Sequence, residues 1–155
     1  MTSALENLCG PAKPLSLEPP DQAELDGLMQ SGRVRLKDAQ NEQISLESRF
    51  SLAYSAAHAL CLAALRRQGF RTQQRYIVFQ VLPHTLGLGP EIWRVLDKCH
   101  VQRNLAEYEG ILDIDHQLFA ELIQATKTVL NKLENQYLSI QLTRNLEPVP
   151  RNPPP

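Results

Sequence analysis

Residues 45–69, SLESRFSLAYSAAHALCLAALRRQG, constrain the fold more than any other stretch of the chain. Apolar residues recur there at spacings of three and four and also cover further faces, which predicts a helix that is apolar nearly all round. Ser45 can cap its start. Arg66 and Arg67 suit its negative C-terminal end, and Gly69 ends it. Such a helix has to be covered by neighbours on most sides, so the segment predicts a central helix in a helical protein.

Two further segments combine helical signals with residues that interrupt helices. A first helix is predicted after Pro20, but Gly27 and the following Ser-Gly-Arg weaken it, and it is expected to break near there. Residues 72–87, TQQRYIVFQVLPHTLG, contain β-branched residues that could form a strand. A helix is favoured because Thr72 can cap it and no partner strand is evident. Pro83 is expected to end that helix.

Two more helices are predicted from their end signals and their periodicity. Pro90 suits the first turn of a helix that runs from Glu91 to about Glu109, and Gly110 ends it. A last helix is predicted over roughly 115–137, because its apolar positions form one stripe. The predicted fold class is therefore all-α, a bundle of four to five helices.

Proline content sets the expected domain boundaries. Residues 1–18 hold several prolines and are predicted to form an irregular arm, and residues 141–155 end in LEPVPRNPPP, which predicts a flexible Pro-rich tail. The helical bundle domain is expected over 19–140. Hydrophobic residues make up 43% of the chain and charged residues 21%, a balance typical of a folded domain. Residues 1 to about 18 and 144–155 are expected to be dispensable for folding.

Composition also argues against several functional classes. The formal net charge of −1 means that any binding of nucleic acid or anionic lipid has to come from a local patch. There is no apolar run long enough to span a membrane and no signal-peptide pattern, so a cytoplasmic protein is expected. Cys9, Cys61 and Cys99 lie far apart and predict no disulfide framework. No spacing predicts a metal site, and no glycine-rich loop follows a strand, so no metal or cofactor is expected.

The stretch HVQRNLAEY, residues 100–108, gathers polar side chains on one helix. At about 100° per residue, His100, Arg103, Asn104, Glu107 and Tyr108 fall within about 140° of its circumference. Two interpretations stay open. The set can be a hydrogen-bonded seam between helices, with Arg103 paired to Glu107 four residues later, which spacing alone favours. It can also bind phosphate or RNA, because arginine presents a planar fork of donors and histidine titrates near neutral pH.

Two other features lie close to the same question. His58 falls within the apolar 45–69 helix and is either a hydrogen-bonded core histidine or a side chain that faces Arg103. Residues 66–75, RRQGFRTQQR, hold four arginines, which suggests either a patch that touches RNA or a solvated helix end and linker.

The segment RNLAEY after a long amphipathic helix, with SRFSLAYSAAHALCLAAL upstream, resembles the HEPN superfamily (higher eukaryote and prokaryote nucleotide-binding domains) over about residues 21–137. The resemblance implies a small four- to five-helix bundle that dimerises. The family motif is an arginine, usually followed by a polar residue, and a histidine four to six residues after the arginine. In active members these two side chains line a dimer cleft and cut RNA without a metal. Other members are toxins paired with nucleotidyltransferase-like antitoxins, or are catalytically silent.

Matched to that motif, Arg103 takes the arginine position, Asn104 the polar position and Tyr108 the histidine position. A phenol with a pKa near 10 is a poor base at neutral pH. Arg94 and His100 satisfy the bare spacing, but six helical steps place them on different faces.

The expected function is therefore a dimeric HEPN-like binding module with its nucleotide-, RNA- or partner-binding groove around Arg103, and without catalysis. The ligand-binding candidates are Arg103, Asn104, Glu107, Tyr108 and His58. The alternative is a metal-independent endoribonuclease of the toxin type that uses Arg103 and His100, with Tyr108 as a third candidate catalytic residue.

Overall fold

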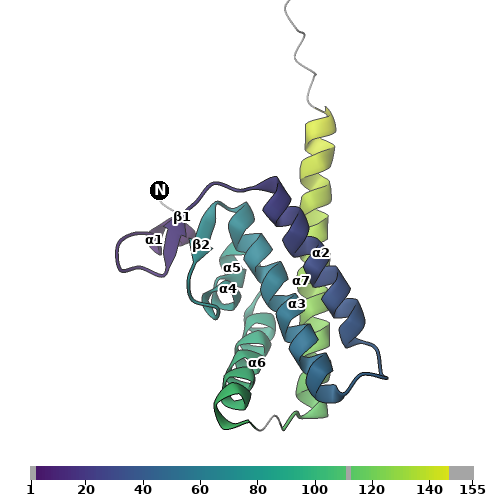
Figure 1. Cartoon of the computed structure of the whole chain (residues 1–155). Coiled ribbons are helices and arrows are strands. Elements are labelled where there is room, and N and C mark those ends of the chain that lie inside the picture. Colours follow the sequence, from purple (N-terminus) through teal and green to yellow (C-terminus); the bar gives the residue numbers. More distant parts are fainter. Residues whose placement is uncertain (1–2, 111–112, 147–155) are drawn as a thin grey trace, which may run out of the picture.

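Four long helices form a bundle around one central member (Figure 1). The computed structural model describes residues 3–110 and 113–146, with the side chains of all of these except 141 and 144–146. The long helices are α2 (Gln22–Ala39), α3 (Leu46–Arg67), α6 (Pro90–Glu109) and α7 (His116–Leu146). Helix α3 contacts the other three. The all-α bundle predicted from the sequence is confirmed.

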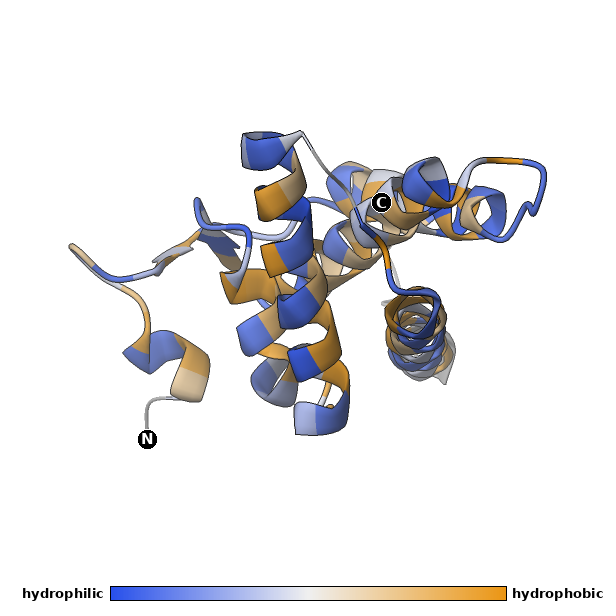
Figure 2. Cartoon of the chain, turned by 90° about the horizontal axis from the view of Figure 1, so that it is seen from below, coloured by the Kyte–Doolittle hydropathy of each residue, from blue (hydrophilic) through white to orange (hydrophobic). Residues whose placement is uncertain are grey.

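Helix α3 occupies the centre because its residues are apolar on nearly every face. Ser45 caps it by accepting a hydrogen bond from the Ser48 amide, as its position predicted. Tyr54, Leu60 and Cys61 are fully buried, together with most of its alanines. Figure 2 shows apolar and polar residues on different sides of the outer helices, and the core lies between their apolar sides.

The predicted break in the first helix is wrong, because α2 runs unbroken from Gln22 to Ala39. The reason lies at Gly32, where α2 crosses α3. A Cβ atom built at Gly32 would lie 2.5 Å from Cγ of Leu60, much closer than carbon atoms can approach. Glycine at position 32 therefore lets α2 and α3 approach closely, and this packing outweighs the low helix propensity of glycine.

The predicted helix over 72–87 is also wrong. Thr72 belongs to strand β2 (Phe70–Thr72), and the residues after it form two one-turn helices, α4 (Ile77–Gln80) and α5 (Leu82–Thr85). Pro83 lies in the first turn of α5 and therefore does not end a helix, contrary to the expectation. The reason is a partner distant in sequence, because β2 pairs antiparallel with β1 (Leu15–Leu17).

That strand pair also corrects the expectation of an irregular N-terminal arm. Residues 1–18 contain helix α1 (Ala4–Asn7) and strand β1, and the side chains of Leu5 and Leu15 are buried against the domain. The arm is therefore part of the packed structure.

An ion-pair network holds this arm in place. The Arg66 guanidinium is 2% exposed and lies 2.5 Å from the Glu24 carboxylate and 3.1 Å from that of Glu18. It also donates to the backbone carbonyl of Pro19 at 2.8 Å. Arg71 pairs with the same two carboxylates. Two of the four arginines in 66–75, the stretch considered as either an RNA-touching patch or a solvated helix end, are thus neutralised within the fold.

Most of the predicted bounds of the last two long helices are confirmed. Helix α6 begins at Pro90 and ends at Glu109, where Gly110 adopts a left-handed conformation with φ of 68°. Helix α7 continues beyond the predicted end at 137 to Leu146, and Figure 1 shows its C-terminal part extending past the other helices. Residues 141–146 of the predicted flexible tail are therefore helical, and 147–155 lie outside the described residues. In the part of the chain that the structure describes, no helix has both the length and the apolar run that crossing a bilayer requires.

Candidate functional site

His100 joins α6 to α3 through one ring nitrogen and contacts its own helix through the other. Its Nδ1 lies 2.8 Å from the hydroxyl of Tyr54, a fully buried residue of α3. Its Nε2 lies 3.1 Å from the side-chain amide nitrogen of Asn104, one turn further along α6. The rings of Tyr54 and His100 are nearly parallel, with centroids 6.1 Å apart. Phe79 of α4 packs edge-on against both rings.

These contacts occupy both ring nitrogens of His100. Which nitrogen donates and which accepts depends on the tautomer of the ring. Burial lowers the pKa of His100, and the charges of Arg103 and Arg75 lower it further against the raising effect of Asp97. His100 is therefore a neutral imidazole with no ring nitrogen left for a substrate.

The guanidinium group of Arg103 lies over the ring of Tyr54. Its guanidinium carbon sits 4.7 Å from the centroid of the Tyr54 ring, a cation–π contact. Its ion pair with Glu107, one turn later on α6, is long at 3.5 Å, and the Glu107 side chain is 62% exposed. The Arg103 side chain keeps 26% of its surface exposed. Arg103 is thus held in one orientation by an aromatic face and only weakly neutralised.

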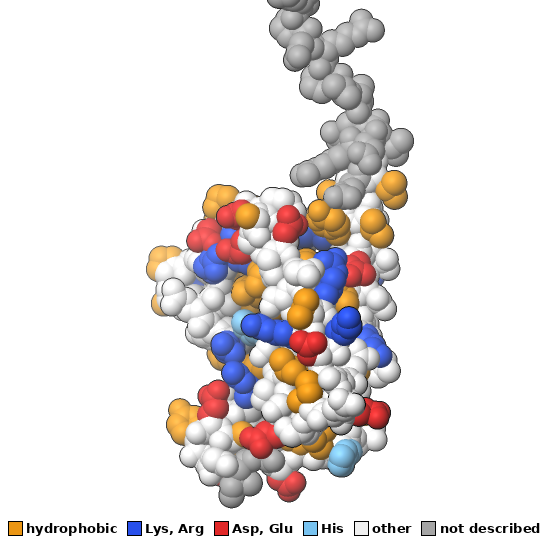
Figure 3. All heavy atoms as spheres, turned by 45° about the vertical axis from the view of Figure 1, so that its right-hand side comes forward, with side chains coloured by type: hydrophobic (Ala, Val, Ile, Leu, Met, Phe, Trp, Pro, Cys, Tyr) orange, Lys and Arg blue, Asp and Glu red, His pale blue; other side chains and the backbone are white. Residues whose placement is uncertain are grey.

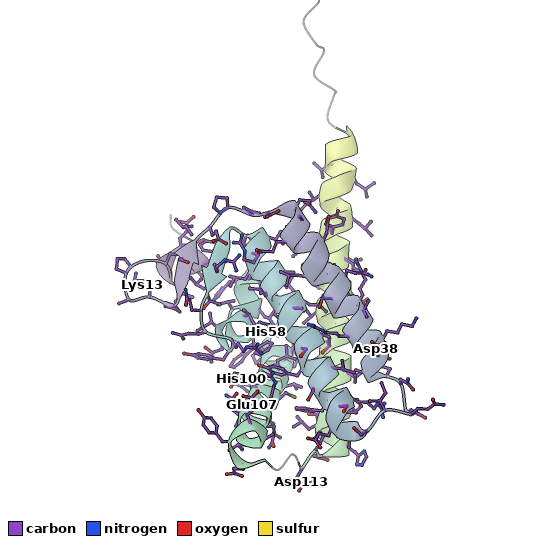
Figure 4. All side chains as sticks on the ribbon, viewed as in Figure 1. Lys13, Asp38, His58, His100, Glu107 and Asp113 are labelled. Atoms are coloured by element: carbon purple, nitrogen blue, oxygen red, sulfur yellow. The ribbon has the colours of Figure 1, made fainter. Side chains whose placement is uncertain are left out.

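His58 faces this group from α3, the second of the two possibilities that the sequence left open. Its ring packs edge-on against Phe79, with centroids 6.1 Å apart. Burial, followed by the charges of Arg75, Arg103 and His100, lowers the pKa of His58 to about 4. Among the described residues, none makes a hydrogen bond to its ring. Figure 4 shows His58 and His100 in the same region between α3 and α6.

Arg75 completes the site, and sequence reasoning did not single it out. It lies in the exposed link between β2 and α4. Burial raises the pKa of Tyr54 against the opposing charges of Arg103 and Arg75, whereas burial and the charge of Arg75 both lower the pKa of His58 and His100. The only sequence signal was the arginine-rich stretch 66–75, which could not show which arginine points where. We call the residues that meet here the Arg103 cluster: Tyr54, His58, Arg75, His100, Arg103 and Asn104.

Two of the expected residues lie outside the centre of this cluster. Tyr108 is 90% exposed and makes no described contact with it, and Glu107 reaches it only through the long ion pair. Tyr108 was expected on the edge of the polar face, about 140° from Arg103, and helix α6 turns that edge to the surface. Leu96, by contrast, is buried inside the bundle, so it does not need a second subunit to cover it.

Two further observations concern possible metal ligands and the thiols of the described residues. No three His, Cys, Asp or Glu side chains of the described residues gather closely enough to hold a metal ion. Burial raises the pKa of Cys61, and burial raises that of Cys99 to about 12, so both thiols are protonated at neutral pH.

Comparison with known proteins gives no match, because no family model, curated protein or solved structure matches this chain. The interpretation of the Arg103 cluster therefore rests on its own geometry and charge.

Proposed function

We propose that this chain is a helical, HEPN-like binding module whose Arg103 cluster holds a phosphate group of a nucleotide or of RNA, without catalysing a reaction. The observation that carries the proposal is the convergence of Arg75 and Arg103 from different segments on one polar cluster. The only carboxylate paired with either guanidinium in the described residues is the exposed Glu107. Two partly free guanidinium groups with neutral imidazoles beside them suit a phosphate, which accepts several hydrogen bonds at once.

Binding is favoured over cleavage by the state of the two histidines. A general base needs a free nitrogen within reach of the proton that it removes. Both nitrogens of His100 are engaged, by Tyr54 and Asn104. His58 has a free ring, but its pKa of about 4 makes it a weak base at neutral pH. Endoribonuclease activity, the alternative, would require one of these histidines to change its surroundings when RNA binds.

The proposal includes a homodimer in which α6 forms part of the interface. Val101, Leu105 and Tyr108 are exposed and lie four and three residues apart, so they form one apolar stripe on α6, about 140–200° around the helix from Arg103. Leu105→Glu should shift a dimer to monomer in sedimentation. A wild-type monomer at tens of micromolar, about the concentration at which a specific interface is populated, would contradict this part of the proposal. The HEPN resemblance extends the proposal to a nucleotidyltransferase-like partner protein.

The central test is binding of fluorescent single-stranded RNA and of adenosine monophosphate. Arg103→Gln and Arg75→Gln should each weaken binding at least tenfold, which is about 1.4 kcal/mol. Each should also flatten the dependence of RNA affinity on salt by about one phosphate contact. Arg94→Gln is the matched control, because Arg94 is an exposed arginine of the same helix.

Thermal melts of the same variants separate the two interpretations of the cluster. Weaker binding at unchanged stability supports the phosphate site. Lost stability in Arg103→Gln, with no ligand bound by the wild type, would show that the cluster is only a seam between helices. A parallel gel assay for RNA cleavage tests the enzymatic alternative directly.

A further inference from the structure

A second cation, Arg67, lies far along α3 from the Arg103 cluster and has unmet hydrogen-bonding capacity. Its Nη1 donates to the Leu133 carbonyl at 3.5 Å, the longest distance at which such a bond counts. Its Nη2 is buried and has no hydrogen-bond partner among the residues that the structure describes. The Tyr137 ring lies 5.9 Å from the guanidinium carbon, near the limit of a cation–π contact.

No described carboxylate neutralises Arg67, although Arg66, the residue before it, lies between two. Burial lowers the pKa of Arg67, yet a guanidinium stays protonated in proteins. A partly buried cation with an unpaired donor is unfavourable unless a counter-charge is supplied. The fold supplies none among the residues that the structure describes.

A hollow lies between the end of α3 and one face of α7, at this arginine. Six side chains that line it all carry N–H or O–H donors: Arg67, Gln68, Lys132, Asn135, Gln136 and Ser139. Its volume is about 640 Å³, within the range of small-molecule sites. No carboxylate of the described residues belongs to its lining. On the face of the molecule that Figure 3 draws, basic and acidic side chains are interspersed.

We propose that this hollow is a second anion site that binds a phosphate group, independent of the Arg103 cluster. Arg67 lines the hollow and carries a donor, Nη2, that has no hydrogen-bond partner among the described residues. Lys132 supplies the second positive charge, and the amides and the Ser139 hydroxyl supply neutral donors. Ile140, 44% exposed, adds an apolar surface for whatever the phosphate is attached to.

Amide chemical shifts in nuclear magnetic resonance test this site separately from the Arg103 cluster. Inorganic phosphate, added to about 10 mM to cover millimolar affinities, should shift the amide signals of Gln68 and Gln136. Signals of His58 and Asn104 report the other cluster. Adenosine monophosphate is titrated in parallel to show whether the bound phosphate group belongs to a nucleotide. Tighter binding than inorganic phosphate would mean that the nucleoside adds contacts.

Charge reversal at an exposed position keeps the test independent of folding. Lys132→Glu should weaken phosphate binding at Gln68 and Gln136 at least tenfold, and Arg67→Gln should do the same. Lys37→Glu, an equal charge change at an exposed site on α2, should leave it unchanged, as should Arg103→Gln. The proposal is overturned if the wild type shows no shift at these two amides, or if the shifts persist in Lys132→Glu.

Discussion

Replacing His58 by Gln should remove a specific part of the dependence of stability on pH. The pKa of His58 is about 4 in the folded protein against an ordinary value of 6.5. As pH falls below 6.5, the unfolded chain takes up a proton on this ring first, so the folded state loses stability until pH 4. The gap of about 2.5 pH units corresponds to roughly 3 kcal/mol, at about 1.4 kcal/mol per unit. His58→Gln should lose that much less stability between pH 7 and pH 4.

Urea denaturation followed by circular dichroism at several pH values between 4 and 7.5 measures this difference. His84→Gln, which removes an exposed imidazole, is the matched control and should behave like the wild type. Only the change in the free energy of unfolding with pH is compared between the two proteins. A constant loss of stability caused by altered packing in His58→Gln therefore does not affect the result. Parallel curves for the wild type and His58→Gln would refute the placement of His58 as a buried neutral ring facing Arg75 and Arg103.

The same method tests the packing of the bundle and its N-terminal arm. Gly27→Ala should stabilise α2 by about 0.5–1 kcal/mol, since a Cβ there meets nothing within 4 Å. Gly32→Ala should instead destabilise the protein, because overpacking costs about 1–3 kcal/mol against that same gain; equal effects at the two glycines would contradict the close approach of α2 and α3. Arg66→Ala removes a buried guanidinium, while Glu18 and Glu24 stay paired with Arg71, and should cost about 1.5–3 kcal/mol in urea denaturation. Deleting residues 1–18 should lower the melting temperature, since Leu5 and Leu15 are buried; an unchanged melt would restore the expectation of a dispensable arm.

Sequence alone determined the elements whose signals are local. The start of α3 follows from the Ser45 cap, and the end of α6 follows from Gly110, because caps act through hydrogen bonds and backbone conformations within one turn. The all-round apolar pattern of 45–69 likewise placed α3 at the centre, since burial is the only favourable outcome for such a helix. The helical period also put His100, Arg103 and Asn104 on one face.

Tertiary structure decided what depends on partners distant along the chain. Residues 70–72 form a strand only because residues 15–17 pair with them, and no local signal in 72–87 could supply that partner. Gly32 looked like a helix breaker because the sequence does not show that Leu60 packs against it.

The candidate site depends on distant partners in the same way. Spacing along α6 could not show that the Tyr54 hydroxyl would saturate His100, or that Arg75 would reach the cluster from another segment. Nor could the run of arginines at 66–75 show which of them meet a carboxylate. Arg66 and Arg71 do, whereas Arg67 meets none of those that the structure describes. Local sequence sets which groups share a helix face, whereas packing between segments sets which of them meet a counter-charge and which stay available for a ligand.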